Sequence, residues 1–376
     1  MRRMIRSAGA LLLCAGLPVL LSACVVQTVA KNPASLLTQV VESTAEAVSG
    51  VEETTAPETI EEEQIMTNCT PTRDGVSVHG RLRVEGAKLV NARGEPVQLT
   101  GMSSHGMQWY PHFASEGAIR TTAEYGANLF RVAMYTDEGG YLSKPSVADQ
   151  VEKSVDAAIS LDMYTIIDWH ILFDNNPLDH VEEAKAFFAR MAERYKGNPA
   201  VLYEICNEPN GDDVTWAGQV KPYAEQVIPV IRAIDADAII LVGSGTWSQD
   251  IHHAADDPLD ANNVMYTLHF YAGTHTQWLR DRIDYALSKG APIFVSEWGT
   301  SAADGSGGVF LEEAQLWLDF LQERGISWAN WSLCDKRETS AALRTPASSD
   351  GGWAEEDFTE SGWFVFQRFE NSRINE

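Results

Sequence analysis

Two glutamates stand in short polar motifs directly after apolar runs of the sequence. Glu208 lies in Asn-Glu-Pro at 207–209, and Glu297 lies in Ser-Glu-Trp-Gly at 296–299. Cleavage of a glycosidic bond needs two carboxyl groups that flank the bond, one to donate a proton and one to attack or to activate water. A glutamate on its own is more often half of a surface ion pair. The assignment therefore depends on the elements that position the two.

Eight apolar runs alternate with amphipathic stretches from about residue 70 onward. Near-continuous apolar runs are typical of parallel strands that are buried on both faces. Strands are expected at 97–101, 128–134, 164–168, 201–206, 238–242, 264–269, 292–296 and 327–331. Helices are expected at 151–161, 181–195, 222–234, 277–288, 311–323 and 362–370. This alternation predicts an α/β fold, a (β/α)8 TIM barrel, and a short N-terminal β-hairpin at 82–84 and 88–90 should close the N-terminal end of the barrel.

The active site of such a barrel lies at the C-terminal ends of its strands. Polar or aromatic residues follow all eight expected strands. Glu208 follows the fourth strand and Glu297 the seventh, so both side chains are expected to point across one cleft. Arg131, at the end of the second expected strand, should keep Glu297 ionised. The charge of Glu297 should in turn raise the pKa of Glu208, so that one carboxyl is a base and the other an acid.

At these residues the sequence resembles glycoside hydrolase family 5, and within it the bacterial endoglucanases of the bacillus cellulase type. The likeness runs from about residue 80 to 342. It is carried by Leu-Thr-Gly-Met-Ser-Ser-His-Gly-Met-Gln-Trp-Tyr at 99–110, Ile-Asp-Trp-His at 167–170, Tyr-Glu-Ile-Cys-Asn-Glu-Pro-Asn-Gly at 203–211, His-Phe-Tyr at 269–271, Phe-Val-Ser-Glu-Trp-Gly-Thr at 294–300 and Trp-Ala-Asn-Trp-Ser-Leu at 328–333. The resemblance implies a retaining endo-β-1,4-glucanase acting on cellulose and related β-glucans, with Glu208 as general acid/base and Glu297 as nucleophile.

The resemblance also implies roles for the residues around the pair. Those implied to act in catalysis are Arg131 and Tyr271 on the nucleophile, His269 on the acid/base, Asn207 on the sugar 2-hydroxyl, and His170 on hydroxyls or neighbouring groups. Those implied to bind substrate are His105, Trp331 as the floor under the distorted sugar, Trp109 and Tyr135 as platforms on one side, Trp247 as a platform on the other, and Lys336 and Glu338 as polar contacts on the non-reducing side. Platforms on both sides of an open groove indicate internal cleavage of a chain.

Two other interpretations stay open. The same fold and the same two glutamates would also cut mixed-linkage glucan, xyloglucan or mannan. A non-catalytic surface lipoprotein that captures glucan is the alternative from another class, but it would have no need of both Glu208 and Glu297. The chemistry requires no cofactor, and no metal-ligand constellation stands out in the sequence.

The N-terminus has the pattern of a targeting segment. Three arginines within the first six residues precede an apolar run at 8–21, followed by Leu-Ser-Ala-Cys at 21–24. This arrangement describes a secretory signal, and its last four residues resemble the bacterial lipobox, in which Cys24 becomes lipidated. A plain signal peptide is the alternative. We expect a lipoprotein signal peptide at 1–23, an acidic flexible linker at 24–69 and a catalytic domain at 70–376.

The chain is strongly acidic, with 28 Lys and Arg against 53 Asp and Glu and a formal net charge of −25. Such a charge repels nucleic acid and anionic membrane surfaces, so we expect neither as a partner. We expect a secreted monomer on the outer face of a bacterial envelope, in contact with the membrane only through a lipid anchor at Cys24. Cys69, Cys206 and Cys334 lack the spacing of a disulfide framework or a zinc site and are expected to be free.

Overall fold

The computed structural model describes residues 75–374, and the side chains of 75–369. Within this range eight parallel strands form a closed barrel in the order β10-β3-β4-β5-β6-β7-β8-β9. The strands are β3 Thr100–Ser104, β4 Leu129–Tyr135, β5 Tyr164–His170, β6 Val201–Glu204, β7 Ile239–Val242, β8 Val264–Tyr271, β9 Ile293–Gly299 and β10 Trp328–Leu333. The predicted (β/α)8 barrel is confirmed.

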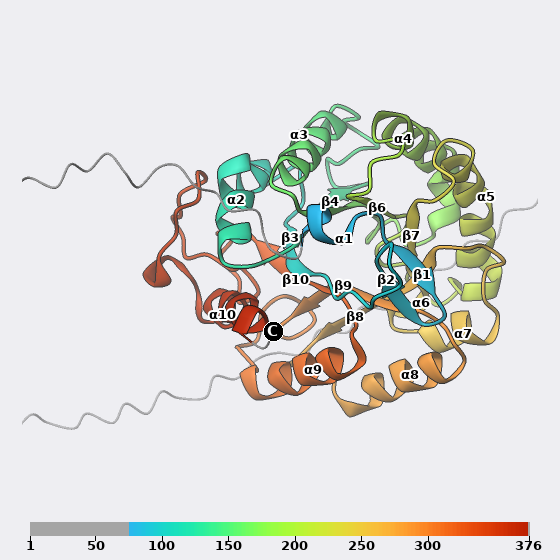
Figure 1. Cartoon of the computed structure of the whole chain (residues 1–376). Coiled ribbons are helices and arrows are strands. Elements are labelled where there is room, and N and C mark those ends of the chain that lie inside the picture. The colour runs from blue at the N-terminus through green and yellow to red at the C-terminus, as the bar shows by residue number, and fades with distance from the viewer. Residues whose placement is uncertain (1–74, 375–376) are drawn as a thin grey trace, which may run out of the picture. The chain divides into compact units, whose positions relative to one another are not determined.

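Helices surround the barrel as an outer ring (Figure 1). They are α2 Glu116–Glu124, α3 Val147–Ser160, α4 Val181–Arg194, α5 Lys221–Arg232, α7 Ile251–Asp256, α8 Gln277–Ser288, α9 Leu311–Arg324 and α10 Glu360–Ile374. Two one-turn helices are also present: α1 Val76–His79, which lies over the centre of the barrel in the view of Figure 1, and α6 Gly245–Ser248. Within residues 75–374 none of these helices combines the length and apolar character needed to cross a membrane.

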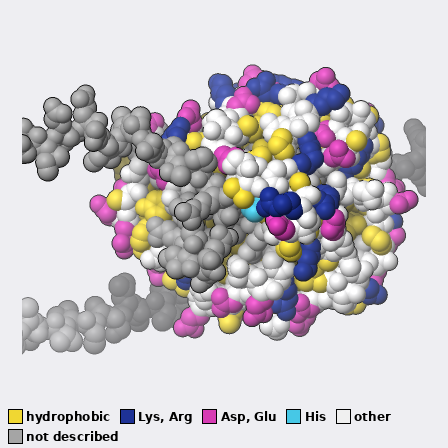
Figure 2. Space-filling model, in the orientation of Figure 1, with side chains coloured by type: hydrophobic (Ala, Val, Ile, Leu, Met, Phe, Trp, Pro, Cys, Tyr) yellow, Lys and Arg dark blue, Asp and Glu magenta, His cyan; other side chains and the backbone are white. Residues whose placement is uncertain are grey.

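The N-terminal end of the barrel is closed by the predicted hairpin, β1 Arg83–Glu85 paired antiparallel with β2 Lys88–Val90. Leu82 and Leu89 from the hairpin segment pack with residues such as Leu129 and Leu202 from the barrel strands in one apolar cluster. The hairpin therefore buries the apolar base of the barrel, as predicted. Acidic and basic side chains are interspersed over the surface around it (Figure 2).

The barrel interior changes from apolar to charged along β5. Side chains of a strand alternate between its two faces, so residues two apart on β5 share the inner face. Tyr164 and Ile166 belong to the apolar base, whereas Asp168 and His170 on the same face are polar and buried. The inner face of the barrel therefore carries charged groups above an apolar base, close to the mouth.

Two local predictions were wrong. The first strand was expected at 97–101 but begins three residues later, because Val97 donates its N–H to Leu89 O (2.9 Å) and belongs to the hairpin. Helix α2 was missed, since a glycine and two threonines within it weaken the helical pattern. A start signal was present: Ser115 Oγ caps α2 by accepting a hydrogen bond from Ala118 N (3.2 Å).

The predicted signal peptide at 1–23, the linker at 24–69, and Cys24 and Cys69 all lie outside the described residues. The other two cysteines, Cys206 and Cys334, are free and buried. Burial raises the pKa of both thiols, the pKa of Cys334 to about 12. Both therefore act as small apolar groups at neutral pH.

Candidate active site

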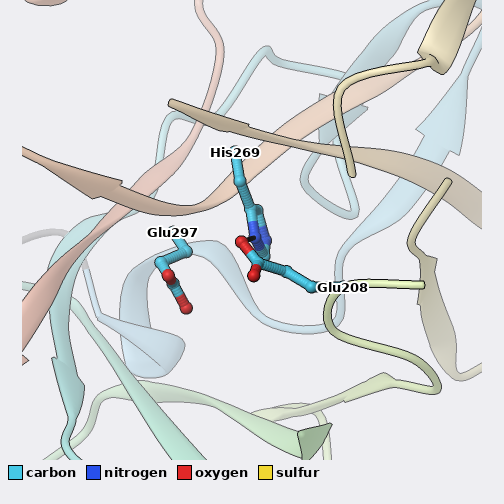
Figure 3. A group of neighbouring side chains, drawn as sticks. All are labelled: Glu208, His269 and Glu297. Carbon is cyan, nitrogen blue, oxygen red and sulfur yellow. Dashed lines mark hydrogen bonds and ion pairs between the residues drawn. The ribbon is translucent and has the colours of Figure 1, made fainter. Parts of the chain in front are cut away.

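Glu208 and Glu297 meet at the mouth of the barrel. Glu208 lies in the loop after β6, and Glu297 lies within β9. One carboxyl oxygen of each and a ring nitrogen of His269 lie within 4.8 Å of one another. Figure 3 shows the Glu208 carboxyl group against the imidazole ring, with the Glu297 carboxyl group beside them. Both glutamates are largely buried, with 9% and 4% of their surface exposed.

Two donors hold the carboxylate of Glu297. Arg131 Nη1 donates to Glu297 Oε2 (3.1 Å), and the Tyr271 hydroxyl donates to Oε1 (2.7 Å). Burial alone would raise the pKa of Glu297, but the charges of His269 and Arg131 outweigh it and hold the pKa below its usual value. Glu297 is therefore ionised at neutral pH, with both oxygens oriented.

Glu208 has the opposite electrostatic balance. Burial raises the pKa of its carboxyl group to about 7, and the charge of Glu297 adds to this. His269 opposes the rise, because its Nδ1 lies 2.9 Å from Glu208 Oε1. Near neutral pH Glu208 is therefore poised between its protonated and ionised forms, whereas Glu297 is a carboxylate.

His269 is charged although it is buried. Burial lowers the pKa of an imidazole, but here the acidic partners outweigh burial and raise it to about 9: Glu204, whose Oε1 lies 3.6 Å from Nε2, and Glu208, which bonds Nδ1. An imidazolium has two N–H donors, so Nδ1–H points to Glu208 and Nε2–H points to Ser296 Oγ, 2.9 Å away. The Ser296 hydroxyl in turn donates to Glu204 Oε1 (2.6 Å).

Arg131 lies in the interior of β4, not at a strand end as predicted. It is fully buried and lies among several oxygens besides those of Glu297. Its Nε donates to Glu204 Oε2 (2.7 Å), and its Nη2 donates to Asn207 Oδ1 (2.6 Å) and lies 3.0 Å from Asp168 Oδ2. A guanidinium suits this position because its donors form a fixed planar fork.

Sequence reasoning assigned no role to Glu204, Ser296 or Asp168. Glu204 joins the two halves of the site, because one of its oxygens accepts from Arg131 and the other from Ser296. Its pKa is lowered to about 2, since the charges of Arg131 and His269 and their hydrogen bonds outweigh its burial. The available signal was a glutamate inside the apolar run 201–206, where a buried charge needs a partner.

The rings of His170 and Trp331 lie against each other and close to the Tyr135 ring. Asp168 Oδ2 lies 2.6 Å from His170 Nδ1 and fixes the imidazole. The rings of His170 and Trp331 stack with centroids 5.1 Å apart and an interplanar angle of 18°. Burial lowers the pKa of His170 to about 3, so this histidine is neutral, unlike His269.

A second group of predicted residues gathers at one end of the cleft. Lys336 Nζ lies 3.3 Å from His105 Nε2 and 2.6 Å from Glu338 Oε2. The His105 ring lies 5.7 Å from that of Trp109, which lies 4.9 Å from the ring of Tyr135. Charged groups and aromatic faces thus alternate at this end of the cleft.

Trp247 is held by an unusual backbone. Thr246, Trp247 and Ser248 have φ angles of 55°, 53° and 56°, in the left-handed region. Such residues cost about 1–3 kcal/mol each and persist only where the surroundings enforce them. Here Trp247 N donates to Pro209 O (3.1 Å) and Ser248 Oγ donates to Asn207 O (2.6 Å). The indole is thereby kept 45% exposed beside Glu208.

These residues line one open cleft of about 530 Å³. All predicted site residues line it except Arg131, Asn207 and His269, which are buried beneath it. Lining residues that were not predicted are Glu138, Leu172, Phe173 and the segment 303–305. Among the described residues, Glu208, His269 and Glu297 are the one trio with metal-ligand spacing. Because the pKa of His269 is raised to about 9, its imidazole carries a proton on each nitrogen at neutral pH and offers no free lone pair to a metal ion.

Paired carboxyl groups at the C-terminal mouth of a (β/α)8 barrel are the arrangement that a glycoside hydrolase requires. The chain belongs to glycosyl hydrolase family 5, since the family described as Cellulase (glycosyl hydrolase family 5) matches residues 90–337. The predicted family is confirmed.

The chain is similar to several named enzymes. It is 56% identical over 291 residues to an endoglucanase of Clostridium saccharobutylicum, covering 77% of this chain and 65% of that one. It is 58% identical over 280 residues to endoglucanase A of Evansella cellulosilytica, covering 74% and 57%. The match thus spans less than two thirds of the length of these relatives. The solved catalytic domain of Thermobifida fusca endoglucanase Cel5A superposes with a TM-score of 0.76 at 36% identity, covering 78% of this chain and 99% of that one.

Proposed function

We propose that the chain is a retaining endo-β-1,4-glucanase that hydrolyses internal bonds of cellulose and related β-glucans. The observation that carries the proposal is the pair Glu208 and Glu297: one carboxyl oxygen of each lies within 4.8 Å of the other, and their pKa values are moved in opposite directions. Retaining enzymes need about 5–5.5 Å between the two carboxyl groups, whereas inverting enzymes leave a gap of about 6.5–9.5 Å for a water.

In the first step Glu297 attacks the anomeric carbon as the bond to the leaving oxygen breaks. Protonated Glu208 gives its proton to that oxygen, so the leaving chain departs as an alcohol. The product is a glycosyl ester of Glu297. Arg131 and Tyr271 keep the attacking carboxylate ionised and oriented before the reaction.

In the second step Glu208 acts as a base. The negative charge of Glu297 disappears when the ester forms, and this charge was one cause of the raised pKa of Glu208. Ionised Glu208 then accepts a proton from water, whose oxygen attacks the anomeric carbon and releases Glu297 as a carboxylate. Two inversions at one carbon restore the original configuration.

Asn207 has the hydrogen-bonding capacity needed for the 2-hydroxyl of the reacting sugar. Its Oδ1 accepts from Arg131 (2.6 Å), and one hydrogen of its Nδ2 goes to Ile171 O (3.1 Å). A side-chain amide has two N–H donors, so one is left for the substrate. Hydrogen bonds to this hydroxyl strengthen in the transition state.

The shape of the cleft supports internal cleavage of β-1,4-glucan. Trp331, Trp109, Tyr135 and Trp247 all line the cleft, and the ring centroids of Trp331 and Tyr135 lie 6.5 Å apart. Flat aromatic faces suit the apolar faces of glucose rings. The endoglucanase names of the relatives favour β-1,4-glucan over mannan or xyloglucan as the main substrate.

The test is release of reducing sugar from carboxymethyl cellulose, mixed-linkage glucan, mannan and xyloglucan. We expect the first two to be cut, and Glu297→Ala to abolish turnover while oligosaccharide binding persists. Added azide should then recover an inverted glycosyl azide with an activated substrate. The matched control is Glu312→Ala, a glutamate exposed on α9. Binding without release by the wild-type chain would instead support a glucan-capturing protein.

We also propose that the enzyme is a monomeric lipoprotein on the cell surface, with Cys24 as its lipid anchor. The support is the basic and apolar pattern before Leu-Ser-Ala-Cys at 21–24. Labelled palmitate should enter the wild-type protein and not Cys24→Ala, which should be released from the cells. Equal labelling of both proteins would contradict the anchor.

A further inference from the structure

Phe173 is a large apolar side chain that does not pack into the core. It is 64% exposed, the highest value among the large exposed apolar side chains of residues 75–369. Exposing an aromatic ring to water is unfavourable. Yet Phe173 lines the catalytic cleft together with Glu208 and Trp247. A ring in this position gains by stacking on a ligand that enters the cleft.

The barrel topology places Phe173 on the leaving-group side. Strands β5, β6 and β7 are neighbours in the barrel. Phe173 follows β5, Glu208 follows β6, and Trp247 follows β7. The two aromatic residues therefore flank the residue that protonates the leaving oxygen. The polar group of Lys336 and Glu338 follows β10, outside this trio of neighbouring strands.

Hydrogen bonds fix the turn that carries Phe173. Leu172 N donates to Asp174 Oδ1 (2.9 Å), and Asp174 Oδ2 accepts from Thr136 Oγ1 (2.5 Å). Asn210 Nδ2 donates both to Leu172 O (2.6 Å) and to Glu208 O (2.8 Å). The turn is thus bound to the loop of the acid/base, and a platform fixed before binding loses little entropy when the ligand arrives.

The attachment of Trp247 to the same loop completes the arrangement. Trp247 N donates to Pro209 O, one residue after Glu208. Both aromatic residues are therefore positioned relative to the acid/base by backbone and amide hydrogen bonds, on opposite sides of it. Neither ring depends on the other for its place.

We infer that Phe173 is a specificity-determining platform that stacks on a glucose unit of the leaving chain, opposite Trp247. This inference rests on the proposed function. It adds a binding contact for the part of the glucan that departs in the first step. A platform for the leaving chain does not touch the reacting atoms, so the contribution of Phe173 should appear only with substrates whose leaving group is a sugar.

Two substrates distinguish binding of the leaving chain from a general effect of Phe173 on the active site. Cellopentaose has a sugar leaving group, whereas β-cellobiosyl fluoride has a leaving group with no ring. With cellopentaose, Phe173→Ala should lower kcat/KM about five- to tenfold, the size of one aromatic stacking contact. With the fluoride, kcat/KM should equal that of the wild type. Phe173→Tyr keeps an aromatic face and should restore cleavage of cellopentaose to within about twofold.

The matched control is Leu316→Ala, which removes an apolar side chain of α9 that is 54% exposed and lies outside the cleft lining. It should leave both rates unchanged. Equal loss on both substrates in Phe173→Ala, or no loss on cellopentaose, would overturn the inference while the enzymatic function stands. Failure of the wild-type chain to cut either substrate would overturn the proposed function and the inference with it.

Discussion

The charge of His269 should set the pH range of the enzyme. The reaction needs Glu297 ionised and Glu208 protonated, so kcat/KM falls at low pH as Glu297 gains a proton and at high pH as Glu208 loses one. His269 lowers the pKa of both glutamates. Replacing it by a neutral residue, His269→Gln, should therefore move both limbs of the pH profile upward.

The size of the shift at the alkaline limb follows from the contact between the two side chains. The charged Nδ1–H of His269 lies 2.9 Å from Glu208 Oε1. A hydrogen bond with a charged partner is worth about 1.5–3 kcal/mol, and about 1.4 kcal/mol corresponds to one pH unit. The alkaline limb, which the pKa of Glu208 places near pH 7, should therefore rise by about one pH unit or more.

The assay is kcat/KM against pH on cellopentaose, with the melting temperature of each variant as a check on folding. Dinitrophenyl cellobioside serves as the control substrate, because its leaving group departs without a proton and its alkaline limb should vanish in both enzymes. Ser296→Ala removes the hydroxyl that links His269 to Glu204. It should raise the alkaline limb too, but by less than His269→Gln does. A folded His269→Gln enzyme whose alkaline limb stays near pH 7 would refute the reasoning.

Three further changes address the other half of the site. Tyr271→Phe removes a donor to Glu297, which raises the pKa of that carboxyl group, so the acid limb of kcat/KM should move upward; an unmoved limb would contradict this. In Gly299→Ala the new Cβ would lie 2.5 Å from the Tyr271 ring and displace the hydroxyl that bonds Glu297, so kcat should fall. The double variant with Tyr271→Phe should lose less kcat than the two single losses combined, because both changes remove the same hydrogen bond. Glu204→Gln breaks a buried ion pair with Arg131 and should lower the free energy of unfolding in urea by about 3–5 kcal/mol; a stability equal to the wild type would exclude a structural charge network.

The fold was predictable because most residues of its strands are apolar and the strands are buried. Short apolar runs that alternate with amphipathic stretches favour buried parallel strands, and the places of β6 and β9 in the strand order put Glu208 and Glu297 across one mouth. Bounds were less accurate at β3, where Val97 is apolar but pairs with the hairpin. The polar ends of β5, β8 and β9 belong to the strands themselves, since hydrogen bonding of the backbone continues past the point where hydrophobicity stops.

Most residues at the cleft surface were predicted from the sequence, but the layer beneath them was predicted only in part. Arg131, Asn207 and His269 were predicted there, whereas Glu204 and Ser296 were not. Glutamates and aromatic residues at strand ends can be read from position alone. Glu204 and Ser296 act through partners that are distant in the sequence, 73 residues away for Glu204 and Arg131 and 27 for Ser296 and His269. Phe173 was missed for another reason. It is an isolated aromatic residue in a turn, and no sequence pattern indicates that its side chain lines the cleft.

The configuration of the first product tests the central claim most directly. Proton NMR of the anomeric protons, recorded during the first turnovers on cellopentaose, distinguishes the two anomers before they interconvert. Attack by Glu297 followed by water assisted by Glu208 predicts that the β-anomer appears first and that the α-anomer grows in only by mutarotation. An α-anomer formed first would contradict both the retaining mechanism and the role of Glu297 as nucleophile.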